Sequence, residues 1–322
     1  MKLKKLILRA CGVLALATLP LQAAYASDWP SQPITLVVPY AAGGTTDRLA
    51  RAFAEYLQTK TKQTTIVVNK PGASTNIGNT DVANAKPDGY TFLIGIDLLA
   101  TNQATGPKLP FDPLSKLTPV SLLTHVPSFI AANPKFKANS AKEMILLARK
   151  DPEKYTISSA TLILQVGFLN SGSDMKLSHI PYKGGAQAAM DAMGGQVDMV
   201  MANIPVLASL VRSGKLKALA VTSDVRAEAF PDVPTLKESG LSTAAFANWY
   251  SLFAPIGTNP EVINKMAKIS SEFVQDPAVR KNLVTDGYIL EASTPEQLRT
   301  LFKNDGAEAQ RFVDANKTLF SH

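Results

Sequence analysis

Residues 38–47, which follow a predicted strand over 34–38, carry the strongest candidate for binding chemistry. The pair Gly43-Gly44 lets the backbone approach a ligand and present successive amides, and the helix expected after it adds partial positive charge. Such a loop binds an anion without a basic side chain. The alternative is a plain strand-to-helix turn capped by Thr45 or Thr46. The candidates here are Tyr40, Ala42, Gly43, Gly44, Thr45 and Asp47, and Asp47 is also expected to orient the loop or to favour the start of the helix.

Small polar residues also follow other predicted strands, and ligands of α/β sheets bind at the carboxyl ends of parallel strands. The candidates are Ser74 and Thr75 before a helix, Asp97 after a strand, Ser159, Ala160 and Thr161 after another, Tyr182, Lys183 and Gly184 after a third, and Asn203 after a fourth. Each alone is typical of an ordinary loop, so their shared position carries the hypothesis.

Catalytic chemistry finds little support in the sequence. The three histidines, His125, His179 and His322, show no ligand or triad spacing, and His179 is expected to be a satisfied core residue. No Gly-x-Ser-x-Gly elbow and no Gly-x-Gly-x-x-Gly fingerprint is present. Asp47 and Asp97 are conceivable as an acid/base pair, but nothing sets their separation. We therefore predict a binding protein with no cofactor and no metal site, and keep a hydrolase as the enzymatic alternative.

The first residues predict export. Lys2, Lys4, Lys5 and Arg9 precede an apolar run over 10–19, and Ala24-Tyr25-Ala26 supplies small residues for cleavage before Ser27. The run is shorter than the roughly 20 residues that a membrane anchor needs. Cys11 permits a lipoprotein alternative, but Arg9 suits a lipid-attachment box poorly. We predict a signal peptide over 1–26 and a periplasmic protein.

Charge and cysteine content narrow the function further. The formal net charge of +7 includes the four basic residues of the predicted signal peptide, so the remaining chain is only modestly basic. No dense basic run with interleaved aromatic residues is present, which disfavours nucleic acid as a partner. Cys11 is the only cysteine, so the exported chain has no disulfide and no thiolate site.

Short apolar strands alternate with helical patterns, which predicts an α/β fold with mostly parallel sheets. The pattern occurs twice and indicates two domains, one over 27–125 plus 251–322 and the other over 126–250. Strand-like stretches at 128–132 and 249–254 are the expected crossings between them, and a helix-rich tail is expected from about 259 to 319.

Several short motifs resemble, in order, those of the Bug/TctC family, the substrate-binding proteins of tripartite tricarboxylate transporters. The resemblance covers essentially the whole exported chain. The motifs are Trp29-Pro30-Ser31-Gln32-Pro33-Ile34, Gly43-Gly44-x-x-Asp47, Asn69-Lys70-Pro71-Gly72-Ala73, Pro87-Asp88-Gly89-Tyr90-Thr91, Pro181-Tyr182-Lys183-Gly184, Gly194-Gly195-Gln196-Val197 and Pro231-Asp232-Val233-Pro234-Thr235.

The resemblance implies a two-domain type II periplasmic binding fold, or Venus flytrap, which holds a carboxylate between Gly43-Gly44 and facing loops of the second domain. It also implies a monomer that delivers its ligand to a membrane permease, and signalling to a membrane sensor is the alternative. The chain departs from the family pattern at 158–165, at Ala202 and at Asp97. These departures make the distal part of the cleft more apolar and add one acid, so they favour a monocarboxylate, aromatic or amide-bearing ligand over citrate.

Overall fold

The computed structural model describes residues 29–106, 109–160, 162–171, 175–182, 184–241 and 246–317. The predicted signal peptide and two candidate site residues, Thr161 and Lys183, lie outside the described residues. The chain divides into two compact units, Met1–Ser31 and Gln32–His322, and the fold below is that of the second unit. Within the described ranges, no helix has both the length and the apolar character needed to cross a membrane.

Ten strands and eleven helices alternate along the described chain. The strands are β1 (Ile34–Val38), β2 (Thr65–Asn69), β3 (Thr91–Ile96), β4 (Leu117–Ala132), β5 (Thr156–Ala160), β6 (Ser178–Tyr182), β7 (Met199–Asn203), β8 (Lys217–Val221), β9 (Ala247–Pro255) and β10 (Ile289–Leu290). The helices are α2 (Thr45–Thr61), α3 (Asn76–Ala83), α4 (Leu98–Thr105), α5 (Pro113–Lys116), α6 (Ala141–Lys150), α7 (Ile163–Ser171), α8 (Gly185–Gly194), α9 (Ile204–Arg212), α10 (Pro260–Gln275), α11 (Pro277–Thr285) and α12 (Pro295–Ala315).

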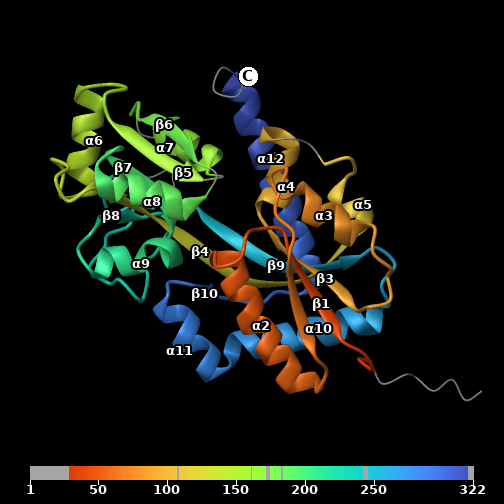
Figure 1. Cartoon of the computed structure of the whole chain (residues 1–322). Helices are drawn as coiled ribbons and strands as arrows, with labels where there is room; N and C mark the ends of the chain where they lie inside the picture. Colours follow the sequence, from red (N-terminus) through yellow and green to blue (C-terminus); the bar gives the residue numbers. More distant parts are fainter. Residues whose placement is uncertain are drawn as a thin grey trace, which may run out of the picture. The chain divides into compact units, whose positions relative to one another are not determined.

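The strands form one path in the order β2-β1-β3-β9-β4-β7-β5-β6, with β10 and β8 also paired to β4. The outer strands pair in parallel as predicted, β1 with β2 and β3, and β5 with β6 and β7. By contrast, β4 and β9 pair antiparallel with each other and with their neighbours. We call β1–β3, β10, α2–α5 and α10–α12 the first lobe, and β5–β8 with α6–α9 the second lobe; β4 and β9 lie between them (Figure 1).

β4 corrects one prediction. The sequence predicts separate strands at 120–124 and 128–132, whereas the structure has one strand of 16 residues that runs from the first lobe into the second. Pro119 and Pro127 made the stretch look interrupted, because proline cannot donate to a sheet ladder. Register shifts against β9 lie at 119–121, beside Pro119, and at 122–124, whereas Pro127 pairs with Ala247 without a shift.

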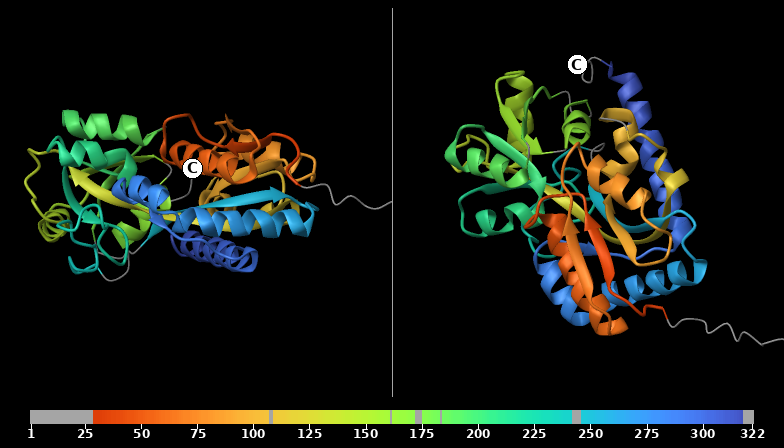
Figure 2. Two further views of the ribbon diagram at one scale, coloured as in Figure 1. Left: turned by 90° about the horizontal axis from the view of Figure 1, so that it is seen from below. Right: turned by 45° about the vertical axis from the view of Figure 1, so that its right-hand side comes forward.

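Helices cover both faces of each lobe because successive strand residues point to opposite faces. In the second lobe, Phe129 and Ala131 pack with α8 and α9, whereas Ile130 and Ala132 pack with α6 and α7. In the first lobe, α3, α4 and α12 share one core with β1, β3 and β9, and α12 runs beside α4 (Figures 1 and 2). In both lobes, parallel strands are followed by loops that lead into helices.

Candidate functional site

The loop between β1 and α2 is fixed from inside by Asp47. Its Oδ2 accepts hydrogen bonds from the amide of Gly43 and from Nε of Arg51, both at 2.9 Å, and its Oδ1 accepts one from Nδ2 of Asn69 at 3.0 Å. Burial raises the pKa of this carboxyl, but the bonds from Arg51, Gly43 and Asn69 outweigh it and leave the pKa lowered. Asp47 thus orients the loop, and its oxygens already have partners.

The bond from the amide of Gly43 to Asp47 corrects the prediction that Gly43 and Gly44 both present their amides to a ligand. Gly43, at φ +86°, turns its N–H back to Asp47, so the amides available to a ligand start at Gly44. Gly44 is the N-cap of α2 and no side chain caps the helix, so the threonine-cap alternative is wrong. The first amides of a helix lack intrahelical partners. Gly44, Thr45 and Thr46 therefore present the partially positive end of a 17-residue helix.

The loop after β2 holds an unusual backbone next to this helix start. Ala73, Ser74 and Thr75 have φ values of 47°, 50° and 78°, a left-handed run that costs energy in residues other than glycine. Asn102 supports it by donating to the carbonyl of Ser74 at 2.9 Å. A Cβ on Gly78 would lie 2.9 Å from Cα of Pro39, so only glycine allows α3 this close to the end of β1. Such strain is typical of functional loops.

Tyr250 on β9 connects the two lobes. Its hydroxyl accepts a hydrogen bond from Nδ2 of Asn203 at 2.5 Å, and Oδ1 of Asn203 accepts one from Ser128 at 3.1 Å. Burial raises the pKa of Tyr250 well above its ordinary value, and the nearby Asp97, Tyr40 and Tyr288 raise it further. The hydroxyl therefore stays protonated. Its proton has no acceptor in the described part of the chain and is free to donate.

The candidates on β5 and β6 serve the second lobe itself. The hydroxyl of Ser159 is buried and lies 2.7 Å from Nε2 of His179, so His179 has a hydrogen-bond partner as expected, but it is half-buried and not a core residue. Burial lowers the pKa of His179. The phenol of Tyr182 donates to Asp191 of α8 at 2.6 Å. Ala160 ends β5, and Gly184 is the uncapped N-cap of α8 with open space around it.

Asp97, at the end of β3, differs from the other candidates. It is only 8% exposed, and its Oδ2 accepts a hydrogen bond from Nδ2 of Asn248 at 2.8 Å. Its Oδ1 is buried and has no partner among the described residues. Burial raises the pKa of Asp97 to about 7, and the charge of Asp305 adds to the rise, while the bond from Asn248 and the nearby backbone amides of Leu98 and Asp97 oppose it.

The contacts bring together some of the predicted residues. Tyr40, Asp97 and Asn203 surround Tyr250, and Thr45 joins them because its carbonyl accepts a bond from Tyr288 at 2.9 Å. Thr75 and Ser74 form the adjoining strained loop, and Ala42 is exposed beside Gly43. No described contact links Ser159, Ala160, Tyr182 or Gly184 to this group.

Tyr250, Asn248 and Tyr288 are not predicted from the sequence. Tyr250 and Asn248 lie in a stretch that resembles a buried crossing strand, where an aromatic or amide side chain gives no separate signal. Tyr288 lies in the helix-rich tail and reaches Thr45 across 243 positions of sequence. Only structure shows such long-range partners.

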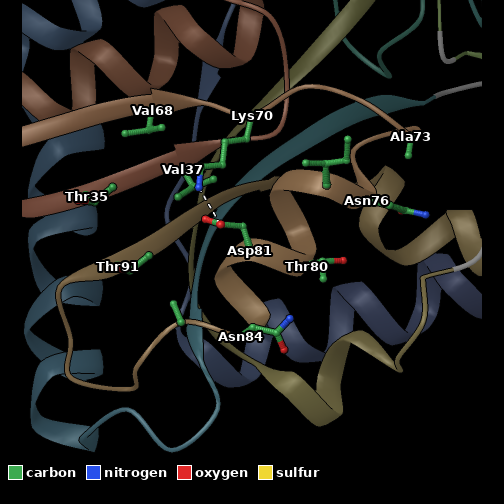
Figure 3. Close-up of a pocket in the computed structure, with 12 residues that line it drawn as sticks. Thr35, Val37, Val68, Lys70, Ala73, Asn76, Thr80, Asp81, Asn84 and Thr91 are labelled. Atoms are coloured by element: carbon green, nitrogen blue, oxygen red, sulfur yellow. Dashed lines mark hydrogen bonds and ion pairs between the residues drawn. The ribbon is translucent and has the colours of Figure 1, made fainter.

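Two hollows of the described structure differ in their relation to this group. One, of about 820 Å³, follows α3 along β1 and β2; the Lys70–Asp81 ion pair at 2.7 Å bridges it, and no predicted site residue lines it (Figure 3). Another, of about 470 Å³, lies between α12 and α7 and is lined by Asp97, His125 and Trp249 among others. No three His, Cys, Asp or Glu side chains in the described ranges are placed to hold a metal ion.

The arrangement combines anion-binding amides with a neutral hydroxyl donor. Gly44, Thr45 and Thr46 supply amides, and Tyr250 supplies a protonated hydroxyl. These are the groups that bind a carboxylate by charge-assisted hydrogen bonds. Because Asn203 joins Tyr250 across the lobes, the position of the second lobe is coupled to this group.

Comparison with known proteins identifies relatives of the whole fold. The family model described as "Tripartite tricarboxylate transporter family receptor" matches residues 49–317. The protein BugT of Bordetella pertussis is 34% identical over 282 residues, which are 85% of this chain and 86% of BugT. The match thus includes both lobes and the strands between them.

Two solved structures with bound carboxylates share the fold. Rpa4515 of R. palustris, solved with adipate, superposes with a TM-score of 0.84 at 28% identity, over 89% of this chain and 98% of that one. MatC from Rhodopseudomonas palustris, solved with malate, gives 0.77 at 28% identity, over 88% and 100% of the two chains. The two-domain periplasmic binding fold predicted from the sequence is confirmed.

Proposed function

Because the chain belongs to the tripartite tricarboxylate transporter receptor family, a family of substrate-binding proteins and not of enzymes, we propose that it captures a small carboxylate at the start of α2. The observation that carries the proposal is the uncapped amino end of α2, with Asp47 holding the preceding loop in place. Binding of adipate and malate by structural neighbours supports a carboxylate as the ligand.

The energy is adequate for capture at micromolar concentrations. Charge-assisted hydrogen bonds contribute roughly 1.5–3 kcal/mol each, and micromolar affinity requires about 8 kcal/mol. The amides of Gly44 and Thr45 and the hydroxyl of Tyr250 would supply most of that. Burial of the aliphatic part of the ligand would supply the remainder.

Closure of the second lobe over the ligand would complete the site. We assign 27–125 plus 251–322 to the first domain and 126–250 to the second, with bending where β4 and β9 pass between them. On this proposal Ser159, Ala160, Thr161, Tyr182, Lys183 and Gly184 approach the ligand from the second domain.

Membership of the receptor family supports a proposal for the cellular role. We propose export to the periplasm, with a signal peptide cleaved near Ala26, and delivery of the ligand by the monomeric receptor to permease subunits in the cytoplasmic membrane. Osmotic-shock fractionation and amino-terminal sequencing of the released protein test the location and the cleavage. Loss of ligand uptake on deletion of the gene tests delivery, and unchanged uptake with altered gene expression would favour a sensor partner.

A thermal-shift screen of the exported chain, stripped of carried-over ligand, tests the binding proposal. The panel contains mono-, di- and tricarboxylates together with their amides and uncharged esters. A ligand at 100 times its dissociation constant stabilises the folded state by about 2.7 kcal/mol, which is a measurable shift. Carboxylates should stabilise the protein and their esters should not. If no carboxylate raises the melting temperature of the folded protein, the proposal is contradicted.

A further inference from the structure

Two residues from different elements, each with a buried side-chain oxygen that has no partner, line one small void near the carboxyl end of β3. Oδ1 of Asp97, at the start of α4, and Oε1 of Gln165, on α7, are buried and have no hydrogen-bond partner among the described residues. Both residues line a void of about 20 Å³, together with Thr101, Leu164 and Asn248. Unpaired buried acceptors are costly, so the void is suited to a group that donates hydrogen bonds.

The surroundings favour a positive charge on that group. The adjoining hollow of about 470 Å³ shares Asp97, Thr101, Leu164 and Gln165 with the void, and it is also lined by Asp224, Asp305 and Glu308. No lysine or arginine of the described chain lines either space. A second carboxylate placed here would meet like charges in a region of low dielectric, whereas an ammonium group would be attracted.

The apolar lining limits the ligand to a slender molecule. Phe168 and Leu164 from α7, Phe246 and Trp249 near β9 and Leu301 from α12 line the larger hollow, so methylene groups would be buried between them. Among the residues that line the two spaces, only Asp97 and Gln165 have a buried side-chain oxygen without a hydrogen-bond partner in the described chain. The open position is therefore that of Asp97 and Gln165.

We propose that Asp97 and Gln165 form a subsite for a protonated amine, so the ligand is an amino-carboxylate whose carboxylate lies at the start of α2. This inference rests on the proposed function and specifies its ligand class. The two neighbours described above were solved with dicarboxylates. Asp97 supplies the charge and Gln165 supplies a neutral acceptor.

Matched ligand pairs of equal chain length test the proposal by calorimetry on the exported chain: succinate with 4-aminobutanoate, glutarate with 5-aminopentanoate, and adipate with 6-aminohexanoate. The wild-type protein should bind the amino-carboxylate of the fitting pair at least about tenfold more tightly, as expected for one charge-assisted hydrogen bond. Asp97→Asn should abolish that preference. Asp224→Asn, which removes an exposed acid from the same hollow, is the matched control and should retain the preference within about twofold.

The outcomes separate the two proposals. Equal or tighter binding of the dicarboxylate by the wild-type protein would overturn the amine subsite and leave carboxylate capture standing. Failure of every ligand that carries a carboxylate would overturn the proposed function itself. If Asp97→Asn does not fold, Gln165→Leu gives a second test: it should weaken the amino-carboxylate about fivefold or more and leave the dicarboxylate unchanged. An unchanged ligand preference in Gln165→Leu would count against the subsite.

Discussion

Two loops of the first lobe, one after β1 and one after β3, each place a buried aspartate beside the start of a helix. Asp47 accepts hydrogen bonds from three groups, and its pKa is lowered. Asp97 accepts one from Asn248, keeps one oxygen unpaired, and has a pKa raised to about 7. Burial raises the pKa of both carboxyls. At Asp47 the bonds from Arg51, Gly43 and Asn69 outweigh it, whereas at Asp97 burial and the charge of Asp305 outweigh the bond from Asn248.

The comparison separates structural acids from acids available to a ligand. A buried carboxylate with a full set of donors stabilises its loop and leaves nothing for a ligand. A buried carboxyl that lacks donors reduces stability at neutral pH, and a cationic ligand would recover that energy. The β1 loop accordingly offers amides to an anion, and the β3 loop offers an oxygen to a cation.

The largest expected effect is on the pH dependence of stability, through Asp97→Asn. The folded-state pKa of about 7 lies above the ordinary value of 3.8, so the unfolded chain loses this proton first as the pH rises. The group therefore costs stability progressively from about pH 4 to pH 7, by up to about 4 kcal/mol. The asparagine variant should be more stable than wild type at pH 8, by about 2–4 kcal/mol, and nearly equal at pH 4.

Urea denaturation of both proteins across that pH range measures the difference. Other titratable groups face Asp97 or the hollow beside it: Asp305 and Glu308 from α12, His125 from β4, Tyr250 from β9 and Asp224 after β8. Burial raises the pKa of Asp305 as well, so some pH dependence should remain in the variant. Parallel stability profiles for the two proteins would refute the assignment of this titration to Asp97.

The next largest effect is expected on carboxylate binding at the loop between β1 and α2. Gly44→Pro removes an amide from the start of α2 and should weaken carboxylate binding about a hundredfold, or roughly 2.7 kcal/mol. Gly44→Ala is the matched control because it keeps the amide: φ is −81°, and the added Cβ would lie 3.7 Å from the carbonyl oxygen of Ala41. Calorimetry should show the alanine variant within about threefold of wild type. Equal losses of carboxylate affinity in both variants would mean that the absence of a side chain at position 44, and not its amide, is required for binding.

A smaller effect is expected at Asp47. Asp47→Asn weakens the bonds from Arg51 and Gly43 and should destabilise the fold by about 2 kcal/mol at pH 7. Because its folded-state pKa is lowered, the stability that Asp47 contributes is present above about pH 4 and is lost as the pH falls below it. Arg51→Ala, which removes a mostly exposed partner, should cost less than about 1 kcal/mol. A loss at Arg51 as large as that at Asp47 would show that the ion pair, and not the amide of Gly43, holds the loop.

Local signals explain which features the sequence predicts. The strand predicted over 34–38 matches β1, because a mostly apolar run there is followed by turn residues. Two of the hydrogen-bond partners of Asp47 are also close in sequence, since Gly43 and Arg51 each lie four residues from it.

Long-range contacts explain what the sequence does not predict. The unpaired oxygens of Asp97 and Gln165 come together only because α7 packs near the start of α4. The strand β4 is continuous despite its prolines because pairing with β9 holds it. The bond between Tyr250 and Asn203 joins residues 47 positions apart, and nothing in either local sequence indicates it.

Tyr250→Phe gives the smallest expected effect and tests whether the two loops act on one ligand. The change removes the hydroxyl that accepts from Asn203 at 2.5 Å and whose proton is free to donate. A hydrogen bond to a charged group contributes at least about 1.5 kcal/mol, so affinity for both members of a ligand pair should fall about tenfold. Tyr155→Phe, in the core of the second lobe, is the matched control and should leave affinity unchanged. If Tyr250→Phe weakens only one member of the pair, Tyr250 serves only one of the two loops. If it weakens both equally, Tyr250 contacts the carboxylate that the two ligands share, and the contrast between Asp47 and Asp97 describes the two ends of one binding site.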